Sequence, residues 1–60
     1  METLLTPDEL ATRLQVKVTA LRDWRYRGTG PKFQRLGGHV RYRPSDVDRW
    51  LRENEVDAAP

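Results

Sequence analysis

The 60-residue sequence has no cysteine, a single histidine (His39) and a single serine (Ser45). Without cysteine, neither a disulfide nor a cysteine-ligated zinc ion can stabilise the chain, and one histidine is too few for the common metal sites. The same scarcity leaves no set of side chains for nucleophilic or acid–base catalysis. We therefore expect a protein that is not an enzyme and that holds neither a metal nor a cofactor.

Long apolar runs are missing as well. No segment approaches the ~20 apolar residues that span a membrane, and no charged-then-apolar segment of the signal-peptide type opens the chain. A chain of this size forms one domain, in which roughly 60% of the unfolded surface becomes buried. We therefore expect a single small domain that is cytoplasmic and does not bind a membrane.

Basic charge, by contrast, is concentrated in the middle of the chain. The formal net charge is only +2, but residues 13–43 carry nine basic side chains and one acidic one, a net charge of +8, whereas residues 1–12 and 44–60 each carry −3. Such a block repels itself unless a polyanion neutralises it, and nucleic acid is the usual polyanion. Nine of the eleven basic residues are arginines, whose forked donors match phosphate and guanine. The pattern indicates nucleic-acid binding; a solvated basic face without a partner is the alternative reading.

A first helix is predicted over Pro7–Leu14. Thr6 is its N-cap, Pro7 suits the first helical position, and Glu9 completes a capping box with Thr6. Eight residues are too few for a helix that is stable alone, so this helix must pack against another element. Its inward-facing residues are Leu10 and Leu14.

Residues 17–28 are predicted to form a second short helix, with Lys17 as its N-cap and Gly28 as its end. At about 100° per residue, its apolar residues form one stripe and its polar residues the opposite face. The apolar stripe comprises Val18, Leu21 and Trp24, and the polar face comprises Thr19, Arg22, Asp23 and Tyr26. The three-residue turn 15–17 makes the pair a helix-turn-helix unit, whose second helix suits the DNA major groove.

A β-hairpin is predicted over residues 32–43, because apolar and polar residues alternate on both sides of Gly37-Gly38. Two registers compete. A two-residue loop of Gly37-Gly38 places Leu36 opposite His39, whereas a three-residue loop that includes His39 places Leu36 opposite Val40. We favour the three-residue loop.

A third helix is predicted to begin at Pro44, with an apolar stripe of Val47, Trp50 and Leu51. Residues 54–60 are polar and acidic, and we expect a flexible tail there. The predicted domain therefore covers residues 1–53.

Several large side chains are assigned to the core and not to nucleic-acid contacts. Trp24 and Trp50 share the helical spacing of the apolar residues, and Tyr42 lies on the apolar side of the hairpin. Arg25 lies only about 40° from Leu21 on the helix, so we expect its stem to pack inward while its guanidinium extends into solvent.

Helix, turn, helix, β-hairpin and helix form the layout of a winged helix-turn-helix domain, a small α+β fold that is mainly α. Over residues 4–52 the sequence resembles the excisionase branch of the MerR-like winged helix-turn-helix proteins, which includes phage and integrative-element excisionases (recombination directionality factors) and small transcription regulators. Its more specific motifs are Gly-Gly-His-x-x-Tyr in the wing and Asp-x-x-x-Trp-Leu in the closing helix. The further matching segments are residues 5–11, 21–24, 30–31, 36–43 and 45–51.

The resemblance implies that the second helix enters the major groove and that the wing contacts the neighbouring minor groove or its phosphates. The candidate contacts on the helix are Lys17, Thr19, Arg22, Asp23, Tyr26 and Arg27. The candidate contacts on the wing are Arg35, Gly37, Gly38, His39, Arg41 and Arg43. We expect Arg22 to be the base reader, because one guanidinium can bond both acceptors of a guanine. Asp23 either accepts from a cytosine amine or orients Arg22 or Arg27.

Two functions of different kinds fit this reading. The first is an excisionase that binds repeated sites in attachment DNA, bends it and promotes excision by an integrase. The second is a stand-alone transcriptional regulator. In both, the partner is double-stranded DNA in a bacterial or phage-infected cell. One small domain covers few base pairs, so we expect a monomer in free solution that associates cooperatively with further copies on DNA. A weaker third hypothesis is a module whose basic face binds an acidic protein.

Overall fold

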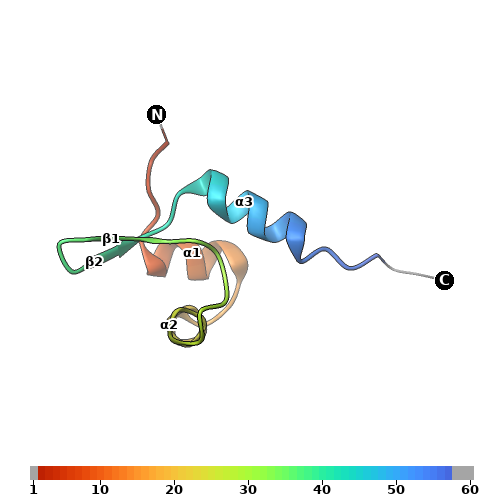
Figure 1. Ribbon diagram of the computed structural model, residues 1–60, viewed down its shortest axis with the longest axis horizontal. Coiled ribbons are helices and arrows are strands. Elements are labelled where there is room, and N and C mark those ends of the chain that lie inside the picture. The colour runs from red at the N-terminus through yellow and green to blue at the C-terminus, as the bar shows by residue number, and fades with distance from the viewer. Residues whose placement is uncertain (1, 58–60) are drawn as a thin grey trace.

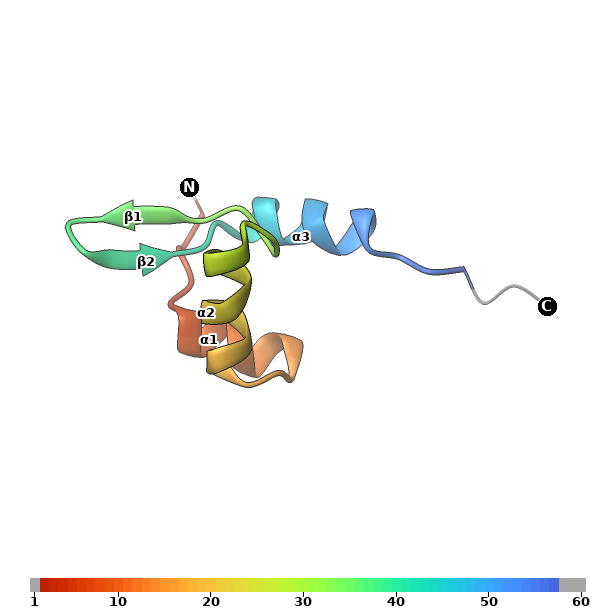
Figure 2. The same cartoon turned by 60° about the horizontal axis from the view of Figure 1, so that its bottom comes forward.

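The computed structural model describes residues 2–57. In chain order its elements are α1 (Pro7–Leu14), α2 (Val18–Arg27), β1 (Gln34–Leu36), β2 (His39–Arg41) and α3 (Pro44–Glu53). The hairpin and α3 extend in opposite directions, and α1 and α2 lie together on one side of them (Figures 1 and 2). This order confirms the predicted fold, a small and mainly helical winged helix-turn-helix.

The start of α1 has the predicted capping box. The Thr6 hydroxyl accepts a hydrogen bond from the Glu9 amide at 3.1 Å, and Glu9 Oε1 accepts one from the Thr6 amide at 2.9 Å. The bond from the Thr6 amide, with a smaller contribution from the Thr6 side chain, lowers the pKa of the Glu9 carboxyl below its usual value of 4.5. Local side-chain chemistry therefore fixes where α1 begins.

The turn between α1 and α2 is closed by Gln15, whose φ of 58° is left-handed, and by a 3.0 Å bond from the Val16 amide to the Ala11 carbonyl. Val16 packs against the core. Leu10 of α1 and Leu21 of α2 are both 0% exposed. Neither helix is long enough to be stable alone. The buried cluster that contains Leu10 and Leu21 therefore stabilises both helices.

The apolar stripe of α2 is narrower than predicted. Leu21 is buried and Trp24 packs against the core, but Val18 is 39% exposed. Val16, in the turn, packs on the core instead, so the first residue of α2 is left at the surface. The stripe of α3 shows the same pattern: Val47 is 1% exposed and Leu51 is 42% exposed.

The hairpin adopts the register that we did not favour. Leu36 pairs with His39 across a two-residue loop, and Arg35 pairs with Val40. Gly37 and Gly38 have φ values of 55° and 87°. Two consecutive positive φ values define the turn whose twist matches that of antiparallel strands, and two glycines adopt it without steric cost. The turn geometry therefore outweighs the apolar pairing of Leu36 with Val40.

An isolated antiparallel bridge ties the N-terminal segment to the residue that follows β2. The backbones of Leu5 and Tyr42 exchange two hydrogen bonds, each of 2.8 Å. The Glu2 carboxylate then reaches the start of α3, where it accepts from the Ser45 amide at 2.7 Å and from the Ser45 hydroxyl at 3.0 Å. Arg43, the N-cap residue of α3, makes no side-chain capping bond, so Glu2 serves as the cap from 43 residues away.

One aromatic contact joins α3 to α2, and a second lies across the base of the hairpin. The rings of Trp24 and Trp50 have centroids 5.3 Å apart, and those of Phe33 and Tyr42 are 6.1 Å apart. Tyr42 is 1% exposed, which confirms its core position. Gly30 lies so close to Trp24 that an added Cβ would be 2.9 Å from the Trp24 Cβ, so the loop after α2 requires glycine there. The buried core comprises Leu10, Ala11, Leu21, Tyr42 and Val47.

After α3, residues 55–57 have no regular secondary structure and are exposed. The remainder of the predicted tail, residues 58–60, lies outside the described residues. None of the helices within residues 2–57 is long and apolar enough to cross a membrane.

Candidate nucleic-acid interface

The polar face of α2 is open to solvent. Its predicted contact residues are all exposed, and Tyr26 is 81% exposed although it is aromatic. Lys17 precedes this face and makes no side-chain capping bond to the helix. These exposed residues are Lys17, Thr19, Arg22, Asp23, Tyr26 and Arg27. All six predicted helix residues are therefore accessible to solvent.

Asp23 and Arg27 form an ion pair one turn apart on this surface. Arg27 Nε lies 3.0 Å from Asp23 Oδ2, and both side chains are more than half exposed. Of the two roles predicted for Asp23, the orientation of Arg27 is the one realised in the free protein. The pair keeps the Arg27 guanidinium close to the C-terminal end of α2.

Arg25 differs from its predicted conformation, because its guanidinium turns inward. Nη1 donates a 2.7 Å hydrogen bond to the Tyr42 hydroxyl, and the guanidinium carbon lies 5.8 Å from the centroid of the Phe33 ring. The hydroxyl of a buried tyrosine needs a partner, and Arg25 is the residue within reach. This side chain therefore bridges α2 and the hairpin.

The predicted wing residues lie on two different faces of the hairpin. Directly paired residues share a face, so Arg35 lies with Val40, and His39 lies with Leu36 on the other face. Arg41 pairs with Gln34 on that second face, and its Nη1 donates to the Val40 carbonyl at 2.7 Å. Of the wing residues within the paired strands, Arg35 alone shares a face with Val40, which packs against the core.

The remaining three wing residues, Arg43, Gly37 and Gly38, differ in their contacts. Arg43 Nε lies 3.6 Å from Glu2 Oε2, so Arg43 also helps hold the N-terminal segment. At the hairpin tip, an added Cβ on Gly37 or Gly38 would meet nothing within 4 Å. The tip is therefore open, and its backbone can approach another molecule closely.

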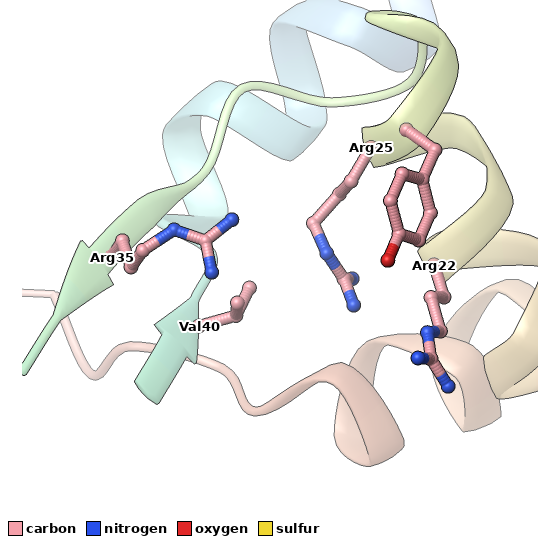
Figure 3. Close-up of a pocket in the computed structure, with 5 residues that line it drawn as sticks. Arg22, Arg25, Arg35 and Val40 are labelled. Carbon is pink, nitrogen blue, oxygen red and sulfur yellow. The ribbon is translucent and has the colours of Figure 1, made fainter. Parts of the chain in front are cut away.

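A groove runs between α2 and the hairpin. It encloses about 280 Å³. In Figure 3 the labelled arginines form a row, with Arg35 and Arg22 at the ends and Arg25 between them, beside Val40. The residues that line the groove are Arg22, Arg25, Tyr26, Arg35 and Val40. Within residues 2–57, the ion pairs are Asp23–Arg27 and Glu2–Arg43, so these three arginines have no acidic partner there.

Sequence reasoning identified Arg22, Tyr26 and Arg35 separately but missed both Arg25 and the groove. The available signal was an arginine on the inward side of a helix in a chain with a buried tyrosine. No three His, Asp or Glu side chains gather into a possible metal site in the part of the chain that the structure describes.

Comparison with known proteins identifies the family. A family model described as a helix-turn-helix domain matches residues 4–55, which covers all five elements. No curated protein and no solved structure gives a significant match. The chain therefore belongs to the helix-turn-helix domain family, a DNA-binding family whose members typically have no catalytic activity.

Proposed function

We propose that the protein is a sequence-specific double-stranded DNA-binding protein in which α2 enters the major groove and the hairpin contacts the adjacent minor groove or its phosphates. The observation that supports it is the exposed polar face of α2 beside the row of arginines. A helix with forked donors on one accessible side has the dimensions and chemistry that the major groove requires.

The residues have different roles in this proposal. Arg22, exposed on the polar face of α2, reads a guanine through two hydrogen bonds. Lys17 and Arg27, at the two ends of α2, contact phosphates, as does Tyr26. The wing contributes its open tip, Gly37-Gly38, and the basic residues beside it. Those wing residues are Arg35, His39, Arg41 and Arg43.

The biological role that we propose is that of an excisionase. The support is the resemblance of the wing motif, which ends in Tyr42, and of the α3 motif, which ends in Trp50-Leu51, to MerR-like excisionases. In this role several copies bind repeated sites in attachment DNA, bend it and assist an integrase. The alternative is a stand-alone transcriptional regulator that uses the same DNA-binding surface.

Footprinting of the DNA around the gene, with and without a neighbouring integrase, tests this role. An excisionase protects several evenly spaced repeats inside an attachment site. A single protected patch over a promoter would favour the regulator instead. Sedimentation of the free protein should show a monomer, and a tight dimer without DNA would contradict cooperative assembly on repeats.

Two substitutions test the division between base and backbone contacts. We expect Arg22→Ala to remove about 1–3 kcal/mol of discrimination between the target and other sequences. Arg41→Ala should weaken binding to all sequences about equally. Arg52→Ala, on α3, is the control and should change neither quantity. Retained discrimination in Arg22→Ala would show that the orientation assigned to α2 is wrong.

A further inference from the structure

We propose that the groove between α2 and the hairpin is a binding site for one DNA backbone phosphate, held jointly by Arg25 and Arg35. The proposal rests on the DNA-binding function above and goes beyond it in naming a specific subsite. It also gives Arg25, which the sequence assigns to the edge of the core, a role in recognition.

The first argument is electrostatic. Arg22, Arg25 and Arg35 line one groove, and none has an acidic partner among residues 2–57. Like charges brought together cost free energy, and an anion placed between them relieves that cost. Since the groove encloses about 280 Å³, a tetrahedral phosphate can enter it.

The second argument is that the two guanidinium groups are already positioned. The guanidinium carbons of Arg25 and Arg35 each lie 5.8 Å from the centroid of the same ring, Phe33. Arg25 is also held by the hydroxyl of Tyr42, which is 1% exposed. That bond uses one of the five N–H donors of Arg25, so others remain for a ligand. Side chains restrained in this way lose less entropy when they bind.

The third argument comes from the shape of DNA. A sugar–phosphate strand separates the major groove from each neighbouring minor groove. If α2 occupies the major groove and the hairpin the minor groove, this strand must pass between them. The groove lined by Arg25 and Arg35 is located there, between α2 and β1 (Figure 3). Arg22 lies at the far end of the row and remains available for base edges.

The salt dependence of duplex binding tests the proposal. Binding of the full chain to a 25-bp duplex is measured by fluorescence anisotropy at several salt concentrations, for Arg25→Gln, Arg35→Gln, the double variant and the control Arg52→Gln. Each phosphate contact contributes about 0.9 to the slope of log K against log salt. Because both arginines hold the same phosphate, the double variant should lose about 0.9, whereas two separate phosphates would give a loss of about 1.8. The control should keep the wild-type slope.

A second measurement separates failure of this site from failure of the DNA-binding function. Inorganic phosphate is titrated into the free protein while the Nε–Hε NMR signals of the arginines are followed. Signals of Arg25 and Arg35 should shift together, and that of Arg52 should not. If the protein does not bind duplex DNA, the proposed function is wrong, and the titration alone then decides whether the groove binds an anion.

If the protein binds DNA but the double variant keeps the wild-type slope, the phosphate site is wrong and the DNA-binding function stands. Arg25→Gln can also affect folding through the lost bond to Tyr42, so circular dichroism melts accompany every variant. Substitution of Arg35 gives the clearer test, because its side chain is exposed and its loss should not affect folding. Arg35→Lys combined with Arg25→Gln keeps one positive charge at the phosphate, so this pair should recover most of the slope that the double glutamine variant loses.

Discussion

Helices α1 and α2 pack against each other and bury one leucine each to the same degree, yet their N-termini are built differently. α1 begins with a complete capping box and has Asp8 and Glu9 in its first turn. The N-cap of α2, Lys17, makes no side-chain capping bond, and α2 has no acidic residue in its first turn. By local rules α1 is well stabilised, whereas α2 breaks the rules for both capping and the helix dipole.

The difference follows from what each helix faces. In the proposed interface α1 makes no contact with DNA, so its termini can be optimised for stability. A negative or neutral cap at the start of α2 would stand where the proposed interface needs positive charge. Departures from local rules are expected at functional sites, and the uncapped start of α2 is such a departure. Stability of α2 therefore depends on tertiary contacts, through Leu21 and Trp24.

The largest expected effect is the loss of stability when a buried leucine of α1 or α2 is removed. Leu10→Ala and Leu21→Ala each remove a fully buried side chain, so each should cost about 2–5 kcal/mol. The core of so small a domain contributes only a few kcal/mol, so both variants should be largely unfolded by circular dichroism at 25 °C. Leu51→Ala, at a position 42% exposed, is the milder control. If Leu21→Ala remained folded while Leu10→Ala unfolded, the two helices would not depend equally on their buried leucines.

The next effect distinguishes α1, which is expected to affect stability alone, from α2, which is expected to affect DNA binding as well. Thr6→Ala removes the cap of α1 and should lower the free energy of unfolding by about 1 kcal/mol, measured by urea denaturation. DNA affinity of the folded fraction should not change, because α1 does not contribute to the proposed interface. Thr12→Ala, an exposed threonine inside α1, is the matched control. A loss of affinity in Thr6→Ala beyond the loss of folded protein would assign α1 a direct contact.

Lys17→Ser tests whether a lysine at the N-cap of α2 lowers stability but increases DNA affinity. Serine can accept from the exposed amides at the start of α2, so stability should rise by about 0.5–1 kcal/mol. Duplex affinity should fall at the same time, because one positive charge near a phosphate is lost. Lys32→Ser removes an exposed lysine without creating a cap, and it should show no gain in stability. If Lys17→Ser gained stability and kept its affinity, Lys17 would have no role at the interface.

The smallest effect is the pH dependence of α1. The folded-state pKa of Glu9 is lowered, mainly by its bond from the Thr6 amide, so the stabilisation is present above the usual value of 4.5 and is lost as the pH falls below it. Glu9→Gln keeps a capping-box residue without the charge. Its thermal stability should therefore fall less steeply than that of the wild type as the pH drops from about 5 to about 3. Equal slopes would show that the Glu9 charge contributes nothing.

The bounds of the helices were predictable because their signals are local. The box of Thr6 and Glu9 fixes the start of α1, Gly28 ends α2, and Pro44 begins α3, as the structure shows. Each of these signals acts within about one turn of the residue concerned. The polar face of α2 was predictable for the same reason, since helical periodicity alone places its residues on one side.

The hairpin register was predicted wrongly, because the apolar pairing of Leu36 was given more weight than the local turn chemistry of Gly37-Gly38. Apolar alternation was compatible with two loops, and the favoured one paired Leu36 with Val40. The twist required at Gly37-Gly38 selected the other, in which Leu36 pairs with His39. As a result Arg35 lies on the face that carries Val40, and Arg41 lies on the opposite face.

By itself, then, the sequence determined the elements, their order and the concentration of basic charge, because these depend on neighbours within a few positions of the chain. Tertiary structure decided where the N-terminal segment lies, with Glu2 capping α3 from 43 residues away. It also decided that Arg25 turns toward Tyr42, 17 residues away, and lines a groove with Arg35. Contacts of this kind depend on how packed elements meet, and no local pattern records which side chains will face each other once the core has formed.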